Sequence, residues 1–393
     1  MHFLESFALE CGAKIDKPFL LEKYHPLDVD NFISFYPFDN SQSRTYDYWT
    51  EFIRIILPAL QKQGISIVQM GRAQDPIIET CIPILGKLTV NQSSYIIRNS
   101  LLHLCVNSFS AQLSSALRKK TIALFSESPP ETNGPYETDE NFLALLPKLE
   151  GNKYSYTAEE NPKTINSIYP EEIAKSVCSL LDIDLEFPYK TLYVGEKYSN
   201  SQIESIPSKP IDISNLTVDS LIVRMDKKFD ESALYNQLMS CSCSIITDRP
   251  ININLIKNFR SRIPQFVYML TDKHDKKYVE ELFDEGIQCL LLTEIEDEKQ
   301  INDLKLEYLD YGRIHKEKGG KKEDLEFLKD KDMNKLFYRS AKYLINDGDI
   351  YLNLASMEEG LTVESLGNHS PQKVIDNELF WKEHDHYILF ERV

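Results

Sequence analysis

Short apolar runs alternate with amphipathic segments along the first third of the chain. The clearest apolar runs have the length of strands and are bounded by polar turns: FISFYPF (32–38), ISIVQM (65–70), LLHLCV (101–106) and TIALF (121–125). Between the first two, residues 45–64 carry apolar side chains at helical spacing and end at Gly64. This alternation with short connections predicts a parallel, doubly wound α/β sheet.

Residues 96–126 are the central part of that pattern. The run LLHLCV ends abruptly at Asn107 and Ser108, a stretch of small residues follows, and two lysines precede TIALF. This order predicts a strand, a tight turn, a helix and a second strand. The turn at Asn107 would then lie at the carboxyl edge of the sheet, where open α/β sheets bind ligands. This half of the chain has no GxGxxG, so the dinucleotide fingerprint is absent.

The alternation restarts near residue 188 and predicts a second α/β sheet. Its apolar runs include TLYVG (191–195), SLIVRMD (220–226) and QFVYMLT (265–271). We interpret the mixed charge run at 312–335 as a solvated hairpin or helix, and the Asp-Gly step in YLINDGDIYLN (343–353) predicts a hairpin. The expected domains are 1–187, 188–311, and a charged linker with a C-terminal helix and hairpin appendage, 312–393, packing on the other two.

Composition and charge narrow the class of protein. The chain has 393 residues, of which 42% are hydrophobic and 27% charged, an ordinary globular composition. The net charge of −17 disfavours duplex nucleic acid as an obligatory partner, although a local basic pocket for a nucleotide remains compatible with it. No apolar run reaches the length of a membrane span, and the N-terminus lacks a basic leader. We therefore expect a cytoplasmic protein.

The cysteines and histidines do not indicate a metal site. Seven cysteines without regular spacing fit a reducing compartment, and Cys241 and Cys243 are interpreted as buried thiols. His103 lies inside an apolar run and is interpreted as a core histidine, while His384 and His386 lack an identifiable third ligand. We expect neither a metal nor a cofactor.

The order of motifs between residues 32 and 126 resembles the donor-binding domain of the ADP-heptose lipopolysaccharide heptosyltransferases, glycosyltransferase family 9. The resemblance rests on FYPF–DNSQSR–YDYW, GISIVQMG, LGKLTV and NSLLHLCVNSFSAQLSSALRKKTIALFS, and extends over roughly residues 30 to 180. It implies a GT-B-like fold of two Rossmann-like domains. It also implies a metal-independent transferase that moves a sugar from a nucleotide diphosphate sugar to a hydroxyl acceptor in the interdomain cleft.

The resemblance assigns donor-binding positions to three loops. The turn after the first strand would hold the diphosphate through Ser41, Ser43 and Arg44. The loop after the second strand contains Gly71, Gln74 and Asp75, at the place where the family often has an acid against the base or ribose of the donor. The family's central Asp-Thr/Ser-Gly-x-x-His falls on Asn107, Ser108 and Gln112.

The chain departs from the family at this centre and in the order of its domains. Asn107 and Gln112 replace the aspartate and the histidine, and neither side chain carries a charge. Stabilisation of the leaving diphosphate would then rest on Arg44, Ser108 and the amides of a helix N-terminus. The family also places its acceptor domain first, whereas this chain begins with the donor-like domain, which implies permuted domains.

A transferase of this type needs a base on the acceptor side to deprotonate the attacking hydroxyl. Acids follow several predicted strands of the second domain, and Asp226 and Glu196 are the preferred candidates, with Asp248 and Asp272 behind them.

Two other functions remain open. One is a catalytically inactive nucleotide-sugar-binding or scaffold protein that retains the fold, which the neutral residues at 107 and 112 motivate. The other is a glycosyltransferase acting on modified DNA bases, which would need a basic groove formed by the lysines between 315 and 335. The acceptor is accordingly expected to be a glycan, lipid-linked or nucleobase hydroxyl.

Overall fold

The computed structural model describes residues 1–149, 151–213, 218–271, 274–316, 319–366 and 369–393. The chain divides into two compact units, Met1–Pro188 (unit 1) and Tyr189–Val393 (unit 2), and each is described by itself. Unit 2 includes the segment 312–393, which supplies strands to its sheets. In the described ranges, no helix combines the length and the apolar character needed to cross a membrane.

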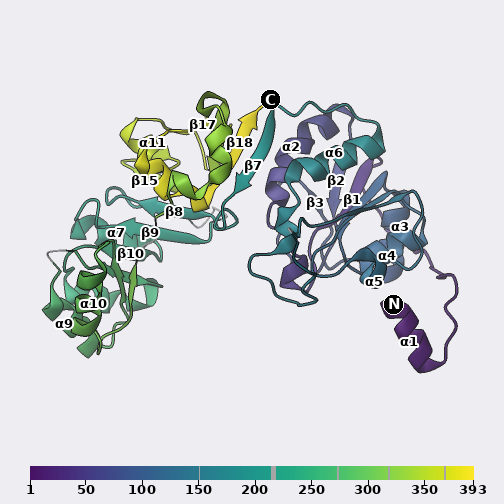
Figure 1. The fold of residues 1–393 in the computed structure, drawn as a ribbon. Helices are drawn as coiled ribbons and strands as arrows, with labels where there is room; N and C mark the ends of the chain where they lie inside the picture. The colour runs from purple at the N-terminus through teal and green to yellow at the C-terminus, as the bar shows by residue number, and fades with distance from the viewer. Residues whose placement is uncertain (150, 214–217, 272–273, 317–318, 367–368) are drawn as a thin grey trace. The chain divides into compact units, whose positions relative to one another are not determined.

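Unit 1 is built on a six-stranded parallel sheet (Figure 1). Its spatial order is β3-β2-β1-β4-β5-β6, the order of the Rossmann fold. The prediction of a doubly wound parallel sheet is therefore confirmed. The strands are β1 (Phe32–Tyr36), β2 (Ser66–Gln69), β3 (Ile82–Pro83), β4 (Leu102–Val106), β5 (Thr121–Leu124) and β6 (Phe142–Leu145).

Helices cover both faces of this sheet. Helix α2 (Trp49–Lys62) packs on α6 (Pro170–Leu181), and α3 (Val90–Asn99) packs on α4 (Phe109–Ala116), so that the two pairs lie on opposite faces (Figure 1). Smaller helices are α1 (Phe3–Cys11), α5 (Pro130–Asn133), η1 (Gln42–Arg44) and η2 (Thr164–Ser167). The sheet's central strands are buried on both faces, as expected for a parallel sheet under two helical layers.

Local sequence explains where these helices begin. Helix α3 starts at a capping box, in which Thr89 accepts from the backbone of Gln92 and the side chain of Gln92 accepts from the backbone of Thr89. Helix α6 has proline at its first position and two glutamates in its first turn. On the α2 face, the rings of Phe35, Trp49 and Phe52 pack together and are almost fully buried.

Unit 2 contains an eight-stranded sheet in which most strands follow one another across the sheet in chain order. From β8 to β13 each strand lies beside its predecessor in parallel, and β15 then returns to the other side of β8. The single reversal of strand order thus lies between β8 and β15. The strands are β8 (Gln202–Ser205), β9 (Ser220–Arg224), β10 (Ser244–Thr247), β11 (Phe266–Met269), β12 (Leu290–Thr293), β13 (Ile314–Lys316), β15 (Lys342–Asn346) and β16 (Asp349–Tyr351).

The connections of this sheet follow the expected α/β alternation. They contain α7 (Glu231–Ser240), α8 (Ile253–Asn258), η3 (Arg260–Arg262), α9 (Lys276–Asp284) and α10 (Glu298–Glu307). The predicted hairpin is confirmed, because β15 and β16 pair in antiparallel fashion. Its turn residues Asp347 and Gly348 both have positive φ, as a two-residue hairpin turn requires.

A smaller antiparallel sheet completes unit 2. Its order is β17-β14-β18-β7, and its last pair joins the first strand of the unit to the final one. The strands are β7 (Tyr189–Val194), β14 (Leu336–Ser340), β17 (Gln372–Lys373) and β18 (Tyr387–Arg392). Short helical pieces connect them: η4 (Lys322–Asp324), η5 (Glu326–Asp330), η6 (Met333–Lys335), α11 (Leu354–Glu358), α12 (Glu378–Lys382) and η7 (His384–His386). Tyr338, Phe380 and Tyr387 form its buried aromatic core.

Candidate functional site

The candidate site lies at the carboxyl edge of the unit 1 sheet, between β1 and β4. The strand order reverses at this point, because β2 and β3 extend the sheet to one side of β1 while β4 to β6 extend it to the other. Doubly wound sheets bind ligands at such a reversal. The loops after β1, β2, β4 and β5 all leave from this edge, and they carry every donor-binding residue that the sequence predicted except Gln112.

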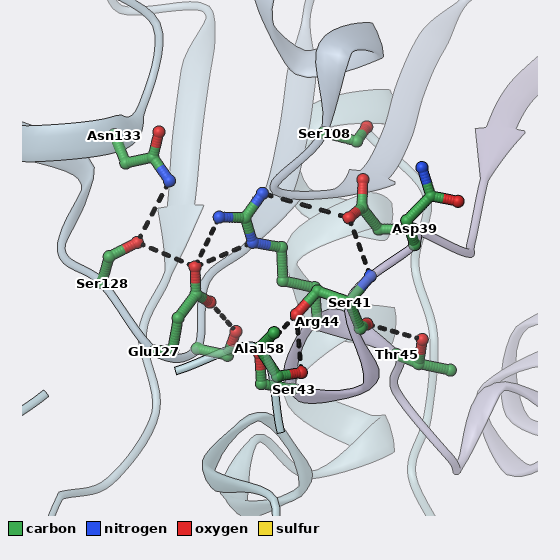
Figure 2. Close-up of polar contacts among 12 residues, drawn as sticks. Asp39, Ser41, Ser43, Arg44, Thr45, Ser108, Glu127, Ser128, Asn133 and Ala158 are labelled. Atoms are coloured by element: carbon green, nitrogen blue, oxygen red, sulfur yellow. Dashed lines mark hydrogen bonds and ion pairs between the residues drawn. The ribbon is translucent and has the colours of Figure 1, made fainter. Parts of the chain in front are cut away.

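Arg44 is the predicted diphosphate cation, and in the structure it is paired with Glu127. Its Nε and Nη2 atoms donate to Oε1 of Glu127 at 2.8 and 2.6 Å, and its Nη1 lies 4.0 Å from Oδ1 of Asp39. Figure 2 shows the guanidinium between these two carboxylates. A diphosphate would therefore compete with Glu127 for Arg44.

Glu127 is a site residue that the sequence reasoning missed. Burial raises the pKa of this carboxyl, but hydrogen bonds from Arg44 and Ser126 outweigh burial, so that the pKa is lowered. Ser126 donates to Oε2 at 2.5 Å. Ser128 donates to Oε1 at 3.2 Å (Figure 2). The available signal was its position, because Glu127 comes just after the predicted strand TIALF.

Ser41 and Ser43 tie the turn after β1 to a second loop. The hydroxyl of Ser41 donates to the carbonyl of Ala158 at 2.9 Å (Figure 2). The hydroxyl of Ser43 donates to the carbonyl of Thr157 at 2.9 Å. Since a serine hydroxyl has one proton, both donors are used within the protein. These contacts shape the turn and hold the loop at 157–160 beside it.

The loop after β2 is organised around a buried carboxylate. Asp75 accepts hydrogen bonds from the backbone nitrogen of Arg72 at 2.7 Å and from its Nε at 2.8 Å. A Cβ on Gly71 would lie 2.6 Å from Oδ2 of Asp75, which explains the glycine. Gln74 is exposed at the tip of this loop.

Arg72 brings a second guanidinium to the edge. It donates to the carbonyl of Asp39 at 3.2 Å and to the side chain of Asn40, so it connects the loops after β1 and β2. Its hydrogen bond to Asp75 raises the pKa of Arg72. The sequence pattern does not distinguish this residue, although it follows Gly71 directly.

Asn107 and Ser108 follow β4 at the carboxyl edge of the sheet, as predicted, and the strand order reverses at this point. Asn107 is 2% exposed, and its side-chain Nδ2 is a buried donor with no hydrogen-bond partner among the described residues. Ser108 caps α4 by accepting from the backbone nitrogen of Ser110 at 3.3 Å. Gln112 is exposed on α4. Asn107 and Ser108 thus lie at the edge, and Gln112 lies on the helix surface.

A buried chain of polar side chains fixes the start of α4. His103 Nδ1 lies 2.9 Å from the hydroxyl of Ser34, and its Nε2 lies 3.0 Å from that of Ser110, which in turn lies 2.9 Å from Ser108. Burial lowers the pKa of His103 to about 3, so the ring is neutral near pH 7. The interpretation of His103 as a core histidine is confirmed.

The predicted catalytic acids belong to unit 2. Both oxygens of Asp226 accept from Arg224, at 2.7 Å each, and the side chain of Asp226 is only 5% exposed, whereas Glu196 is exposed. Asp248 pairs with the neighbouring Arg249, and Asp272 lies outside the described residues. Glu196 is thus the more accessible of the two preferred acids, and a catalytic role for either stays a prediction. Among the residues that the structure describes, no group of three or more His, Cys, Asp or Glu is placed to hold a metal ion.

The chain is similar to known glycosyltransferases over part of its length. Residues 29–162, which contain all six strands of the unit 1 sheet, match the model of glycosyltransferase family 9 (heptosyltransferase). This match covers 134 of 393 residues. The resemblance noted in the sequence is therefore confirmed for this part of the chain. A search of curated proteins gives no match.

Solved structures with some likeness to the chain include glycosyltransferases. ADP-heptose LPS heptosyltransferase II of E. coli is 16% identical, over 45% of this chain and 50% of that one, with a TM-score of 0.32. A family 9 glycosyltransferase of Veillonella parvula DSM 2008 is 18% identical, over 45% and 49%, with a TM-score of 0.34. The iron-containing dodecameric glycosyltransferase TibC of enterotoxigenic E. coli H10407 is 13% identical, over 44% and 52%, with a TM-score of 0.36. The chain spans about half the length of these proteins.

Proposed function

We propose that unit 1 binds a nucleotide diphosphate sugar at the carboxyl edge between β1 and β4, and that the protein transfers the sugar to a hydroxyl acceptor. The family match over residues 29–162 and the Rossmann strand order support this activity. The observation that carries the site is the convergence of two guanidinium groups, those of Arg44 and Arg72, on Asp39 in the turn after β1, at the reversal of strand order.

Arg44 and Arg72 are the guanidinium groups proposed to face the diphosphate. Guanidinium groups bind phosphate oxygens with two parallel hydrogen bonds, which makes them suited to this role. When Arg44 turns to a phosphate, Glu127 loses its strongest partner and becomes available to accept from a hydroxyl of the donor. The Arg44–Glu127 pair would thus hold the free site in order and exchange partners upon binding.

The proposed reaction forms one bond and breaks one bond at the anomeric carbon of the donor. The acceptor oxygen attacks this carbon, the bond to the diphosphate oxygen breaks, and the nucleoside diphosphate leaves with the electron pair. The acceptor's proton passes to a carboxylate, for which Glu196 and Asp226 remain the predicted residues. Because Asn107 and Gln112 are neutral, the charge on the leaving diphosphate would be balanced by Arg44 and Arg72.

A thermal-shift panel of nucleoside diphosphates and nucleotide sugars tests the binding. A ligand that binds the native state raises the melting temperature by mass action. We expect one nucleotide to stabilise the native protein and to lose that effect in Arg44→Ala. The matched control is Arg98→Ala. Arg98 lies on α3, away from the site, and is paired with Glu22. Absence of any nucleotide effect, or equal loss in both variants, would refute the site.

Glu127→Gln tests the same site with the opposite expected effect on affinity, because it should strengthen diphosphate binding where Arg44→Ala weakens it. The amide keeps the shape of the side chain but removes the charge that competes for Arg44. Since hydrogen bonds to charged groups contribute about 1.5–3 kcal/mol, we expect this variant to bind the diphosphate about tenfold more tightly, measured by calorimetry. Weaker binding in Glu127→Gln would show that the carboxylate does not compete with the ligand.

Binding of the donor without transfer is the second candidate function. The neutral side chains of Asn107 and Gln112, and the pairing of Arg44 with Glu127, both favour it. Release of nucleoside diphosphate from the nucleotide sugar identified above separates the two functions. Release above the uncatalysed rate supports the transferase, and tight binding without release supports a nucleotide-sugar-binding protein.

A further inference from the structure

Residues 155–160 of unit 1 form a segment, the strap, that borders the candidate site. The backbone nitrogen of Tyr156 donates to the carbonyl of Glu127 at 2.9 Å. Two residues farther on, the carbonyl of Ala158 accepts from the backbone nitrogen of Ser43 at 3.0 Å, in addition to its bond from a serine hydroxyl. The strap is therefore hydrogen-bonded both to the loop after β5 and to the turn after β1.

The far end of the strap is held by Gln42 and by a buried carboxylate. The side chain of Gln42 donates to the carbonyl of Glu160 at 3.1 Å and accepts from the backbone nitrogen of Glu160 at 2.9 Å. The carboxylate of Glu160 accepts from the hydroxyls of Ser155 and Thr164, at 2.5 and 2.7 Å. Because both ends are tied in this way, the backbone between them is ordered before any ligand arrives, which lowers the entropy cost of binding.

Tyr156 combines a backbone that favours glycine with a large, exposed side chain. Its φ is +53°, in the left-handed region that is strained for a bulky residue. The residue is 64% exposed, so packing inside unit 1 does not account for the ring. A glycine would suit this backbone better, and the tyrosine ring is therefore available for a contact outside the unit's own core.

A second tyrosine and an acid lie near this ring. Burial raises the pKa of the Tyr154 phenol, and the charges of Glu131 and Tyr156 raise it further, so both groups are within electrostatic reach of Tyr154. Glu131 belongs to α5, which follows the loop after β5. The Glu127 side of the site thus carries two tyrosine rings, one half-buried and one exposed.

The order of these groups matches the order of parts in a nucleotide. Arg72 and Arg44 are proposed to face the diphosphate, and Glu127 would accept from a hydroxyl once Arg44 has turned to a phosphate. Tyr156 comes next, because its backbone is bonded to that of Glu127. On the other side of the site, Asp75 has both oxygens engaged by Arg72 and offers no free acceptor to a ribose.

We propose that the base of the nucleotide stacks on the ring of Tyr156, with Tyr154 beside it. An aromatic ring offers a flat apolar face to any base, and such stacking contributes substantially to nucleotide binding. This assignment rests on the proposed function, because it takes the diphosphate to lie at Arg44. It places the base beyond Glu127, whereas the resemblance to family 9 suggests the loop of Asp75.

Calorimetry on the full chain with ADP, GDP, UDP, CDP and inorganic pyrophosphate tests this assignment. We expect Tyr156→Gly to weaken binding of a nucleoside diphosphate about tenfold and to leave pyrophosphate binding unchanged, whereas Arg44→Ala should weaken both. Tyr156→Phe keeps the ring and should bind like the native protein. The matched control is Tyr24→Gly, which removes a 67% exposed tyrosine that packs on Tyr95.

A thermal melt of Tyr156→Gly separates lost stacking from lost structure. Relief of the left-handed backbone offsets the greater freedom of glycine in the unfolded chain, so the melting temperature should stay close to that of the native protein. A large fall in the melting temperature together with weaker binding of every ligand would assign Tyr156 to the fold and overturn the stacking role.

The remaining outcomes distinguish this assignment from the proposed function. If neither a nucleoside diphosphate nor pyrophosphate binds, the donor site is refuted and the position of the base with it. If Arg44→Ala weakens nucleoside diphosphate binding and Tyr156→Gly does not, the donor site stands and the stacking role is overturned. Equal weakening of both ligands by Tyr156→Gly, or lost binding in Tyr156→Phe, also overturns it, since stacking acts on the base alone.

Discussion

Replacing Glu204 by glutamine tests how much the buried ion pairs of unit 2 stabilise it. The positive charges of Lys342 and Arg224 overcome the effect of burial and lower the pKa of Glu204 from 4.5 to about 2. At about 1.4 kcal/mol for each pKa unit, the ionised form contributes about 3 kcal/mol to stability near pH 7. Since removing one partner from a buried pair leaves the other uncompensated, we expect Glu204→Gln to lose about this amount.

The pH dependence of this loss has a definite sign. The folded pKa is lower than the unfolded one, so the contribution is complete above about pH 4.5 and disappears as the pH falls through about 2. The difference between the native protein and Glu204→Gln should therefore shrink to roughly half its neutral value at pH 3. Other acids titrate equally in both proteins and cancel in the comparison.

Urea denaturation followed by tryptophan fluorescence measures the effect in unit 2 alone. The chain has two tryptophans, so a Trp49→Phe background leaves Trp381 of unit 2 as the reporter. The matched control is Glu391→Gln, which breaks the partly exposed pair with Lys331 and should cost less than about 1 kcal/mol. A loss below about 1 kcal/mol for Glu204→Gln at pH 7, or an equal loss at pH 3, would refute the reasoning.

Two further substitutions test other buried contacts. His103→Gln should be less stable than the native protein at pH 7, and this difference in unfolding free energy should fall by about 3 kcal/mol by pH 4. The reason is that the folded pKa of about 3 lies below the ordinary 6.5, so only the unfolded histidine takes up a proton in this range. A difference that does not change with pH in urea denaturation would contradict this. Gly195→Ala should destabilise unit 2 by about 1–3 kcal/mol, because its Cβ would collide with the carbonyl oxygens of His384 and Asp385. An unchanged urea midpoint would show that β7 can shift away.

The fold of unit 1 was predictable because its signal is local. The runs at 32–38, 65–70, 101–106 and 121–125 each contain a buried strand, and the turn at Asn107 falls where the strand order reverses. The pairing of Arg44 with Glu127 was not predictable in this way, because the two residues are 83 positions apart. A local pattern marks both as loop residues and says nothing of which partner each one takes.

Unit 2 shows the same limit on a larger scale. Its strands could be read from the apolar runs, but the return of β15 to the side of β8 depends on a pairing between distant segments. The charge run was interpreted as a solvated hairpin or helix, whereas its described part contains the short helices η4 to η6 and buries Leu325 and Leu328. Two leucines among many charges are a weak periodic signal, although they are enough to anchor the segment.

The pairing of β7 with β18 has a consequence for folding of the protein during its synthesis on the ribosome. All six strands of unit 1 are complete before residue 189 is made, so this unit can fold while the rest is still being translated. In unit 2, Tyr189 pairs with Arg392 and Tyr193 with Leu389. Strand β7 therefore cannot pair until β18 has been synthesised. Until then its edge is open to other chains, and such long-range pairing folds slowly. We therefore expect unit 2 to be more prone to aggregation than unit 1 during synthesis.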